Sequence, residues 1–139
     1  MLTKILAITA FALLSSSSAL AAPGGCHAIS GTYVNQNIPC TVPALACVEA
    51  HLTGDHAGVN TVIITGFDPA TQIFSGTTST VLENGAVITG TIVGTLATGS
   101  VTTSTGGTRQ YAHATGTTVT DGAGNYTGQY CLGNAGGGQ

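Results

Sequence analysis

The chain has 139 residues, of which only 5% are charged, and its formal net charge is −3. Nucleic-acid binding rests on clusters of Lys and Arg, and a chain with only two such residues has no cluster, so we expect no nucleic-acid partner. Attraction to an anionic membrane surface is disfavoured for the same reason.

Residues 1–22 have the pattern of a secretory signal peptide. Lys4 supplies the positive n-region, residues 5–14 form an apolar h-region, and residues 19–21 match the A-x-A cleavage pattern. The apolar run is shorter than the roughly 20 residues of a membrane span, and no later run approaches that length. We therefore predict a secreted protein, extracellular or periplasmic, with no membrane insertion.

The clearest strand pattern lies at residues 86–96, where side chains alternate between two faces. One face would carry Ile88, Ile92 and Leu96 with a glycine between each pair, and the other carries Val and Thr. A period of two is typical of a β-strand. Large side chains alternating with glycine suit the crowded inside of a barrel, so we predict that Leu96 and its partners face the interior.

Similar patterns along the chain predict eight strands and no helix. The predicted strands are residues 26–34, 47–52, 59–66, 72–82, 86–96, 101–105, 110–120 and 125–132. Residues 35–43, which contain two prolines, are predicted to form a loop, and residues 106–108 are predicted to form a turn. Asn84-Gly85 predicts a type I′ hairpin turn.

Eight strands with short connections favour antiparallel neighbours and closure of the sheet on itself. We predict an all-β fold, an eight-stranded antiparallel up-and-down β-barrel, whose interior is filled by side chains or holds one small ligand. The alternative is a β-sandwich, which would need long crossovers that the chain lacks. The barrel domain would span residues 23–133, and residues 134–139 would form a flexible Gly-rich tail.

Four cysteines remain after removal of the signal peptide, and an even number in an exported chain predicts two disulfides. Three pairings are possible. We favour Cys40–Cys47, which closes a short loop, and Cys26–Cys131, which would tie the first strand to the last. A structural zinc site is the alternative, and the export signal and the spacing of the cysteines disfavour it.

Residues 106–116, GGTRQYAHATG, resemble the GGTGRYAGATG motif of the dirigent and allene-oxide-cyclase-like barrel proteins, in particular small secreted bacterial members. The chain departs from that motif at Arg109, Gln110 and His113, where the family has Gly, Arg and Gly. The resemblance implies an eight-stranded barrel and allows homo-oligomers. It does not carry the activity of the plant enzymes to this chain.

Four residues are candidates for binding a ligand: Arg109, Tyr111, His113 and Tyr126. Arg109 is the only Lys or Arg after the signal peptide and could hold an anionic or carbonyl ligand, although a turn in solvent is the alternative. His113 could project from the barrel wall or be exposed. The tyrosines, with Tyr33 and Tyr130, could line a cavity and hydrogen-bond a ligand, or pack in the core.

Glu49, His51, Asp55 and His56 are the candidate metal ligands. Glu49 and His51 are two residues apart on a predicted strand and share a face, and the other two lie in the following turn. Carboxylates and imidazoles bind divalent metals, and His titrates near neutral pH. A polar rim is the alternative, because no metal-binding motif is present. We therefore predict neither a metal nor a cofactor.

The scarcity of titratable groups favours a non-enzymatic protein, since an active site normally needs several. We predict a secreted, disulfide-stabilised, non-enzymatic barrel that binds a small apolar molecule or simply persists outside the cell. One alternative is a dirigent- or cyclase-like protein that steers a reactive intermediate inside the barrel. The other is a structural or adhesive surface protein with Thr- and Gly-rich strands.

Overall fold

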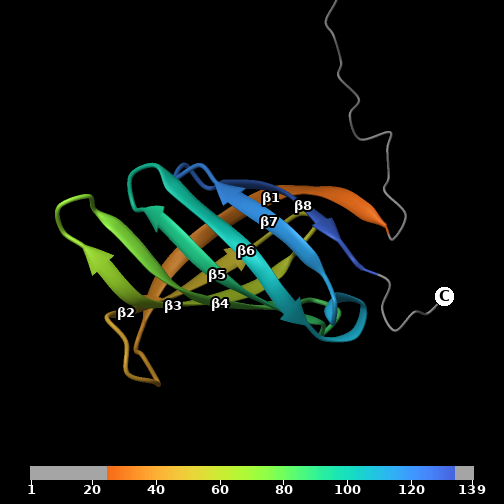
Figure 1. Cartoon of the computed structure of the whole chain (residues 1–139), viewed down its shortest axis with the longest axis horizontal. Helices are drawn as coiled ribbons and strands as arrows, with labels where there is room; N and C mark the ends of the chain where they lie inside the picture. The colour runs from red at the N-terminus through yellow and green to blue at the C-terminus, as the bar shows by residue number, and fades with distance from the viewer. Residues whose placement is uncertain (1–24, 134–139) are drawn as a thin grey trace, which may run out of the picture.

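A computed structural model of the protein describes residues 25–133. These residues form eight antiparallel strands that close into one barrel in chain order (Figure 1). The strands are β1 (Cys26–Ile38), β2 (Ala46–Leu52), β3 (Gly58–Asp68), β4 (Ile73–Leu82), β5 (Val87–Thr95), β6 (Gly99–Gly107), β7 (Thr115–Thr120) and β8 (Asn125–Cys131). The predicted up-and-down barrel is confirmed, and pairing of β1 with β8 excludes the sandwich.

The predicted signal peptide, residues 1–22, and the predicted tail, residues 134–139, lie outside the described residues. Between residues 25 and 133 the structure contains no helix of the length and apolar character that a membrane span requires.

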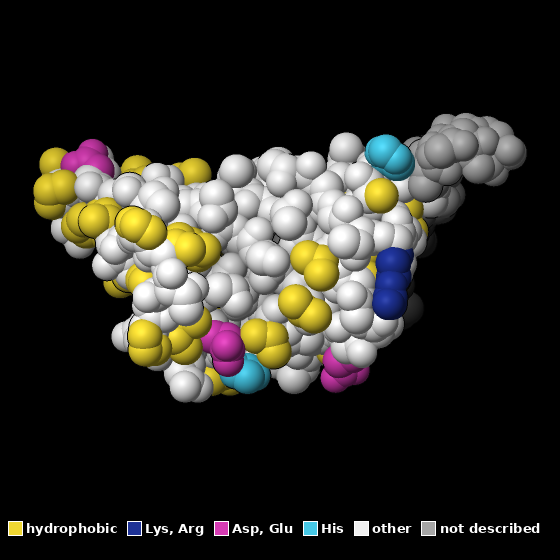
Figure 2. Space-filling model, turned by 90° about the horizontal axis from the view of Figure 1, so that it is seen from below, with side chains coloured by type: hydrophobic (Ala, Val, Ile, Leu, Met, Phe, Trp, Pro, Cys, Tyr) yellow, Lys and Arg dark blue, Asp and Glu magenta, His cyan; other side chains and the backbone are white. Residues whose placement is uncertain are grey.

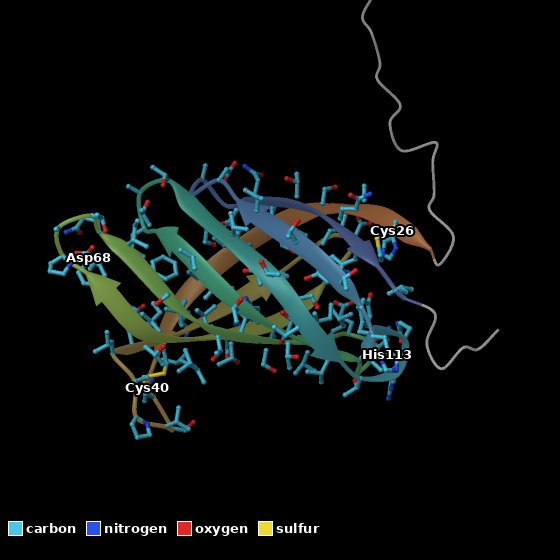
Figure 3. The ribbon with its side chains drawn as sticks, viewed as in Figure 1. Cys26, Cys40, Asp68 and His113 are labelled. Atoms are coloured by element: carbon cyan, nitrogen blue, oxygen red, sulfur yellow. A yellow bond between two sulfur atoms is a disulfide. The ribbon has the colours of Figure 1, made fainter. Side chains whose placement is uncertain are left out.

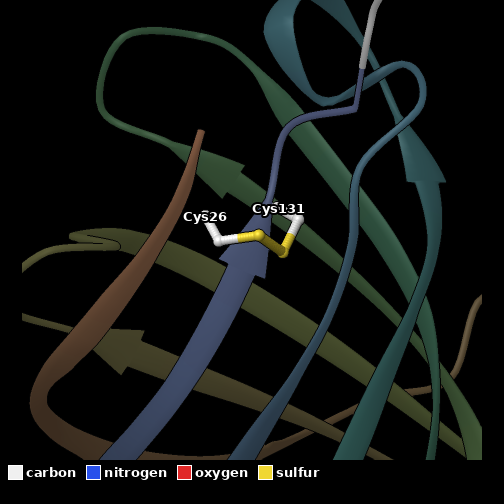
Figure 4. The surroundings of a disulfide bond; sticks show 2 residues. All are labelled: Cys26 and Cys131. Carbon is white, nitrogen blue, oxygen red and sulfur yellow. A yellow bond between two sulfur atoms is a disulfide. The ribbon is translucent and has the colours of Figure 1, made fainter. Parts of the chain in front are cut away.

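A disulfide joins the first and last strands where the barrel closes. Cys26 of β1 lies opposite Cys131 of β8 in the antiparallel ladder, and the two sulfur atoms are bonded (Figure 4). A second disulfide, Cys40–Cys47, fastens the loop between β1 and β2 to the start of β2. The pairs therefore stabilise two different features, the closure of the ring and one of its loops.

The two ends of the barrel are distinct. Cys26 and His113 lie at one end, and Cys40 and Asp68 lie at the other (Figure 3). We call the end with Cys26 and His113 the closed end, and the end with Cys40 and Asp68 the open end. Because the strands run up and down, the loops that follow β2, β4 and β6 all meet at the closed end.

The alternation predicted for β5 is present, with one exception. Ile88 and Ile92 are buried inside the barrel, and Val93, the residue after Ile92 on the same strand, is 52% exposed on the outside. Leu96 does not face the packed interior as predicted, because β5 ends at Thr95 and Leu96 lies in the turn that follows, 83% exposed. A pattern of alternation does not show where the strand stops.

The polar segment predicted to begin a loop at residue 35 continues β1 instead. Six registered pairs join β1 to β2, from Tyr33 opposite Leu52 to Ile38 opposite Cys47. Backbone hydrogen bonds to a neighbouring strand hold Asn and Gln in extended form, although these residues favour turns when isolated. The strand ends where Pro39, which has no N–H to donate, begins the loop.

Residues 106–114 differ from the prediction at both ends. The two glycines at 106 and 107 belong to β6, which is longer than predicted, and β7 begins only at Thr115. Between them Arg109–Tyr111 form a short 3-10 helix, in which the Tyr111 N–H donates to the Thr108 carbonyl. This turn carries Tyr111 into the end of the barrel, where its side chain is buried.

The turn at Asn84-Gly85 is not of type I′, because Asn84 does not have the positive φ which that type requires. The Gly85 N–H donates to the Leu82 carbonyl, the Leu82 N–H donates to the Ala86 carbonyl, and Gly85 has φ +87°. This is a three-residue hairpin loop with a left-handed glycine at its last position, a common way to join antiparallel strands.

Candidate functional site

The interior of the barrel contains a cavity of about 130 Å³. Leu96 and Gly122, which line it, lie in exposed turns that follow β5 and β7, so the cavity reaches solvent at the open end. Side chains from all eight strands contribute to its wall. Besides Leu96 at the open end, its aliphatic and phenylalanine side chains are Ile29, Val48, Ala50, Leu52, Val62, Ile64, Phe74, Ile88 and Ile92.

A buried cluster fills the opposite end and makes it the closed end. The cluster is mainly apolar and aromatic and joins the strands to the loops that meet there. Its members are Ile29, Leu82, Ala86, Ile88, Tyr111, Ala114, Tyr126 and Tyr130. Because Ala86 and Ala114 come from loops and Tyr111 from the 3-10 helix, the loops themselves are packed into the barrel end rather than lying loose above it.

His56 is the polar residue at the centre of this end. It comes from the loop between β2 and β3, and only 6% of its surface is exposed. Its ring lies edge-on to two tyrosine rings, 5.7 Å from Tyr111 and 4.8 Å from Tyr130 between centroids. The Tyr111 hydroxyl is 3.4 Å from His56 Nε2. His56 also lines the cavity, so it forms the floor of the cavity.

Tyr126 holds the loop that carries His56. The His56 backbone N–H donates to the Tyr126 hydroxyl oxygen at 3.0 Å, and the Tyr126 hydroxyl donates to the Thr53 carbonyl at 2.7 Å. A buried tyrosine normally uses its hydroxyl in this way. One side chain of β8 therefore bonds both sides of the loop and fixes His56 in the barrel end.

Burial lowers the pKa of the histidine at the closed end and raises the pKa of the tyrosines around it. Burial, together with the nearby His27, lowers the pKa of His56 below its usual 6.5, and Asp55 opposes this weakly. Burial raises the pKa of Tyr111 and of Tyr130 above the usual 10. Desolvation disfavours the charged form in each case. The floor of the cavity is therefore uncharged near neutral pH.

Glycines opposite the tyrosines make room for the rings. Gly31 of β1 pairs with Tyr126 of β8, and Gly116 of β7 pairs with Tyr130. A Cβ on Gly31 would lie 2.6 Å from the Tyr126 hydroxyl oxygen, and one on Gly116 would lie 2.8 Å from the Tyr130 ring. The two rings therefore lie across glycine backbones, which explains why these strands alternate glycine with large residues.

One side of the cavity wall is polar. We call it the hydroxyl stripe: Ser100 and Thr102 of β6 with Thr118 and Thr120 of β7. Thr102 and Thr118 are directly opposite in the ladder, and the Ser100 and Thr120 hydroxyls are 2.9 Å apart. At one edge the Thr118 hydroxyl donates to the Tyr130 hydroxyl oxygen at 3.4 Å. The apolar side chains of β5 lie beside the stripe, and β2 and β3 supply apolar side chains from the other side of the ring.

Two of the predicted ligand-binding residues belong to this interior. Tyr126 lines the cavity. Tyr111 is buried beneath His56 and contributes to the closed end without lining the cavity itself. Tyr33 and Tyr130, considered with them in the sequence, also line the cavity.

The other two predicted residues lie outside. Arg109 is exposed, and its guanidinium donates to the Asn84 carbonyl in the neighbouring loop, so it joins two loops of the closed end. His113 is exposed beside Gly133. The outer surface that Figure 2 shows carries few charged side chains, and they lie apart from one another.

The four candidate metal ligands do not meet. His51 and Glu49 are hydrogen-bonded at 2.8 Å on the outer face of β2. The Asp55 carboxylate accepts a hydrogen bond from the Ser30 N–H, and His56 is enclosed in the barrel end. Within residues 25–133 there is no group of three or more His, Cys, Asp or Glu side chains arranged to hold a metal ion.

The hydroxyl stripe was missed by sequence reasoning. Its threonines lie in Thr-rich strands in which both faces carry hydroxyls, so composition does not separate the inner from the outer set. The available signal was parity: in β7, Gly116, Thr118 and Thr120 share one face, and the glycine marks it as the crowded side.

The comparisons with known proteins found no matching family model, no similar curated protein and no similar solved structure.

Proposed function

We propose that this protein is an exported, disulfide-stabilised β-barrel that binds a small apolar molecule in its interior. The cavity of about 130 Å³, apolar over most of its wall and open at one end, carries the proposal. Ligand sites in proteins are typically concave, largely apolar and equipped with a few polar groups that orient the ligand.

Export is supported by two independent features. The first is the signal-peptide pattern of residues 1–22. The second is that all four cysteines of the described chain are paired in disulfides. Disulfides persist in oxidising compartments outside the cytosol.

A reaction inside the barrel is the second candidate, and one observation favours it. His56 lies within reach of Tyr111 and Tyr130 at the cavity floor, and these are the types of group that can exchange protons with a substrate. A dirigent- or cyclase-like role, as the resemblance suggests, would use this floor. Binding ranks first because no Asp, Glu, Lys or Arg lines the cavity.

The test is native against denaturing mass spectrometry of the protein recovered from its own secretion medium. We expect a mass excess in the native spectrum that is absent from the denatured one. The denatured mass should also correspond to a chain that begins after Ala21 or Ala22 and has four hydrogens fewer than the reduced chain, because two disulfides form.

A matched pair of variants locates the bound molecule. Ile92→Trp would fill the cavity from the apolar wall, and Val93→Trp places the same bulk on the outer face of the same strand. We expect the excess mass to disappear in Ile92→Trp and to persist in Val93→Trp, with both variants folded by circular dichroism. An excess that survives in a folded Ile92→Trp variant would place the molecule elsewhere and contradict the proposal.

A further inference from the structure

The size of the cavity limits the ligand. At about 130 Å³ it is smaller than the cavities of roughly 300 Å³ and above that hold drug-sized ligands. It is close to an engineered apolar cavity of about 150 Å³ that binds benzene. A single small ring fits this space, whereas a long acyl chain or a fused ring system would have to extend through the open end into solvent.

The charges around the cavity limit the ligand further. Its lining contains no Lys, Arg, Asp or Glu, and the His56 floor is held in its neutral form. A carboxylate or ammonium placed there would lose its hydration without gaining an opposite charge, which is strongly unfavourable. Charged ligands are therefore excluded from the interior.

The hydroxyl stripe supplies two neighbouring polar partners. Thr102 and Thr118 are adjacent in the ladder, and Thr102 has no side-chain hydrogen bond among the described residues. Polar side chains also occur elsewhere in the lining: the Thr80 hydroxyl donates to Asn60 Oδ1 at 3.1 Å, and Tyr33 and Asn35 of β1 belong to the wall. A hydroxyl on the ligand can accept from the Thr102 hydroxyl and donate to Thr118 Oγ1, whose own proton goes to Tyr130, while the rest of the ligand meets Val62, Ile92 and their neighbours.

We propose that the ligand is an uncharged molecule about the size of benzene, carrying one hydroxyl group that accepts a hydrogen bond from Thr102 and donates one to Thr118. This rests on the proposed function, since it names the class of ligand for the same cavity. The apolar wall binds the ring, and the stripe sets its orientation.

Three probes of similar shape test the class: cyclohexanol, methylcyclohexane and cyclohexanecarboxylate, titrated at pH 7 while amide resonances of the protein are followed by NMR. We expect the alcohol and the hydrocarbon to shift resonances of cavity residues and the carboxylate to leave them unchanged. Binding of the carboxylate in the cavity with an affinity equal to that of the alcohol would overturn the proposal.

The double variant Thr102→Val, Thr118→Val removes both hydroxyls with little change of shape. We expect it to weaken cyclohexanol about tenfold, as the loss of hydrogen bonds to a buried group does, and not to weaken methylcyclohexane. The matched control is Thr103→Val, Thr117→Val, the neighbouring pair that is also opposite in the ladder but exposed on the outer face. It should change neither affinity.

The outcomes separate this inference from the proposed function. If methylcyclohexane binds in the cavity and the inner double variant weakens both probes equally, the barrel binds apolar molecules but the assigned class is wrong. If no probe shifts a cavity residue, both the class and the proposed function are overturned.

Discussion

His56 is the residue on which the closed end depends. A neutral imidazole can be packed between Tyr111 and Tyr130, whereas an imidazolium there would be charged in a desolvated position beside His27. Within residues 25–133, Asp55 is the acidic group that raises the pKa of His56, and its carboxylate accepts a hydrogen bond from the Ser30 N–H. The loop that carries His56 is therefore sensitive to acid.

This gives a prediction for the dependence of stability on pH. Because the pKa of His56 is lower in the folded state than its usual 6.5, the unfolded chain binds more protons as the pH falls below that value. The stabilisation is complete above about pH 6.5 and is lost progressively as the pH falls toward the folded-state pKa. Urea unfolding at a series of pH values between 7 and 5 measures it.

Two variants test whether His56 causes this pH dependence of stability. His56→Phe keeps an aromatic ring in the barrel end but removes the contact between Nε2 and the Tyr111 hydroxyl at every pH, and it should flatten the pH dependence in this window. His113→Phe changes an exposed histidine and should leave the dependence as it is. An unaltered slope in His56→Phe would show that another group is responsible.

At the scale of single elements, β1 and β8 show how glycine positions the tyrosines. A Cβ on Gly31 would lie 1.9 Å from the Thr53 carbonyl oxygen, which belongs to the loop that Tyr126 holds. This contact is with backbone and cannot be relieved by turning a side chain. A side chain at Gly31 would therefore displace both the Tyr126 ring and the loop at Thr53.

We predict that Gly31→Ala destabilises the protein by about 2 kcal/mol or more, as overpacking of a filled interior does. The control is Gly66→Ala in β3, where the nearest atom is the Ser75 hydroxyl oxygen, which can rotate away. That change should cost well under about 1 kcal/mol. Thermal and urea unfolding compare the two, and equal losses would mean that the contact with Thr53 is not the cause.

The elements also show what a local pattern can predict. Strongly alternating segments such as β5 were located within a residue or two, because period two is a property of the strand itself. The extension of β1 through residue 38 and the 3-10 helix at Arg109–Tyr111 were not predicted. Both depend on partners far away in sequence: β2 holds the polar end of β1, and the barrel end receives Tyr111.

At the scale of the whole molecule, the decisive contact is the closure of the ring between β1 and β8. Cys26 and Cys131 are 105 residues apart in sequence, so their bond constrains almost the whole unfolded chain. Cys40 and Cys47 are only 7 apart and constrain one loop. In the chain-entropy model a cross-link stabilises more as the closed loop lengthens.

We predict unequal effects when each pair is replaced by serine. Removal of Cys26–Cys131 should lower the free energy of unfolding by up to about 4.7 kcal/mol, and removal of Cys40–Cys47 by about 2.5 kcal/mol. Urea unfolding of the two double variants under the same conditions measures the difference. A loss of equal size for both pairs would contradict the idea that ring closure is the more important constraint.

The sequence by itself determined the fold class: a series of alternating strands with short links favours a closed antiparallel barrel over a sandwich, and the pairing of β1 with β8 decided between them. It also determined which strand faces carry tyrosine and glycine. Only the tertiary structure decided that His56 turns inward while Arg109 and His113 stay outside, because the packing of loops at a barrel end depends on all the strands together. The hydroxyl stripe has the same origin, since identical threonines become inner or outer only when the ring closes and fixes the register.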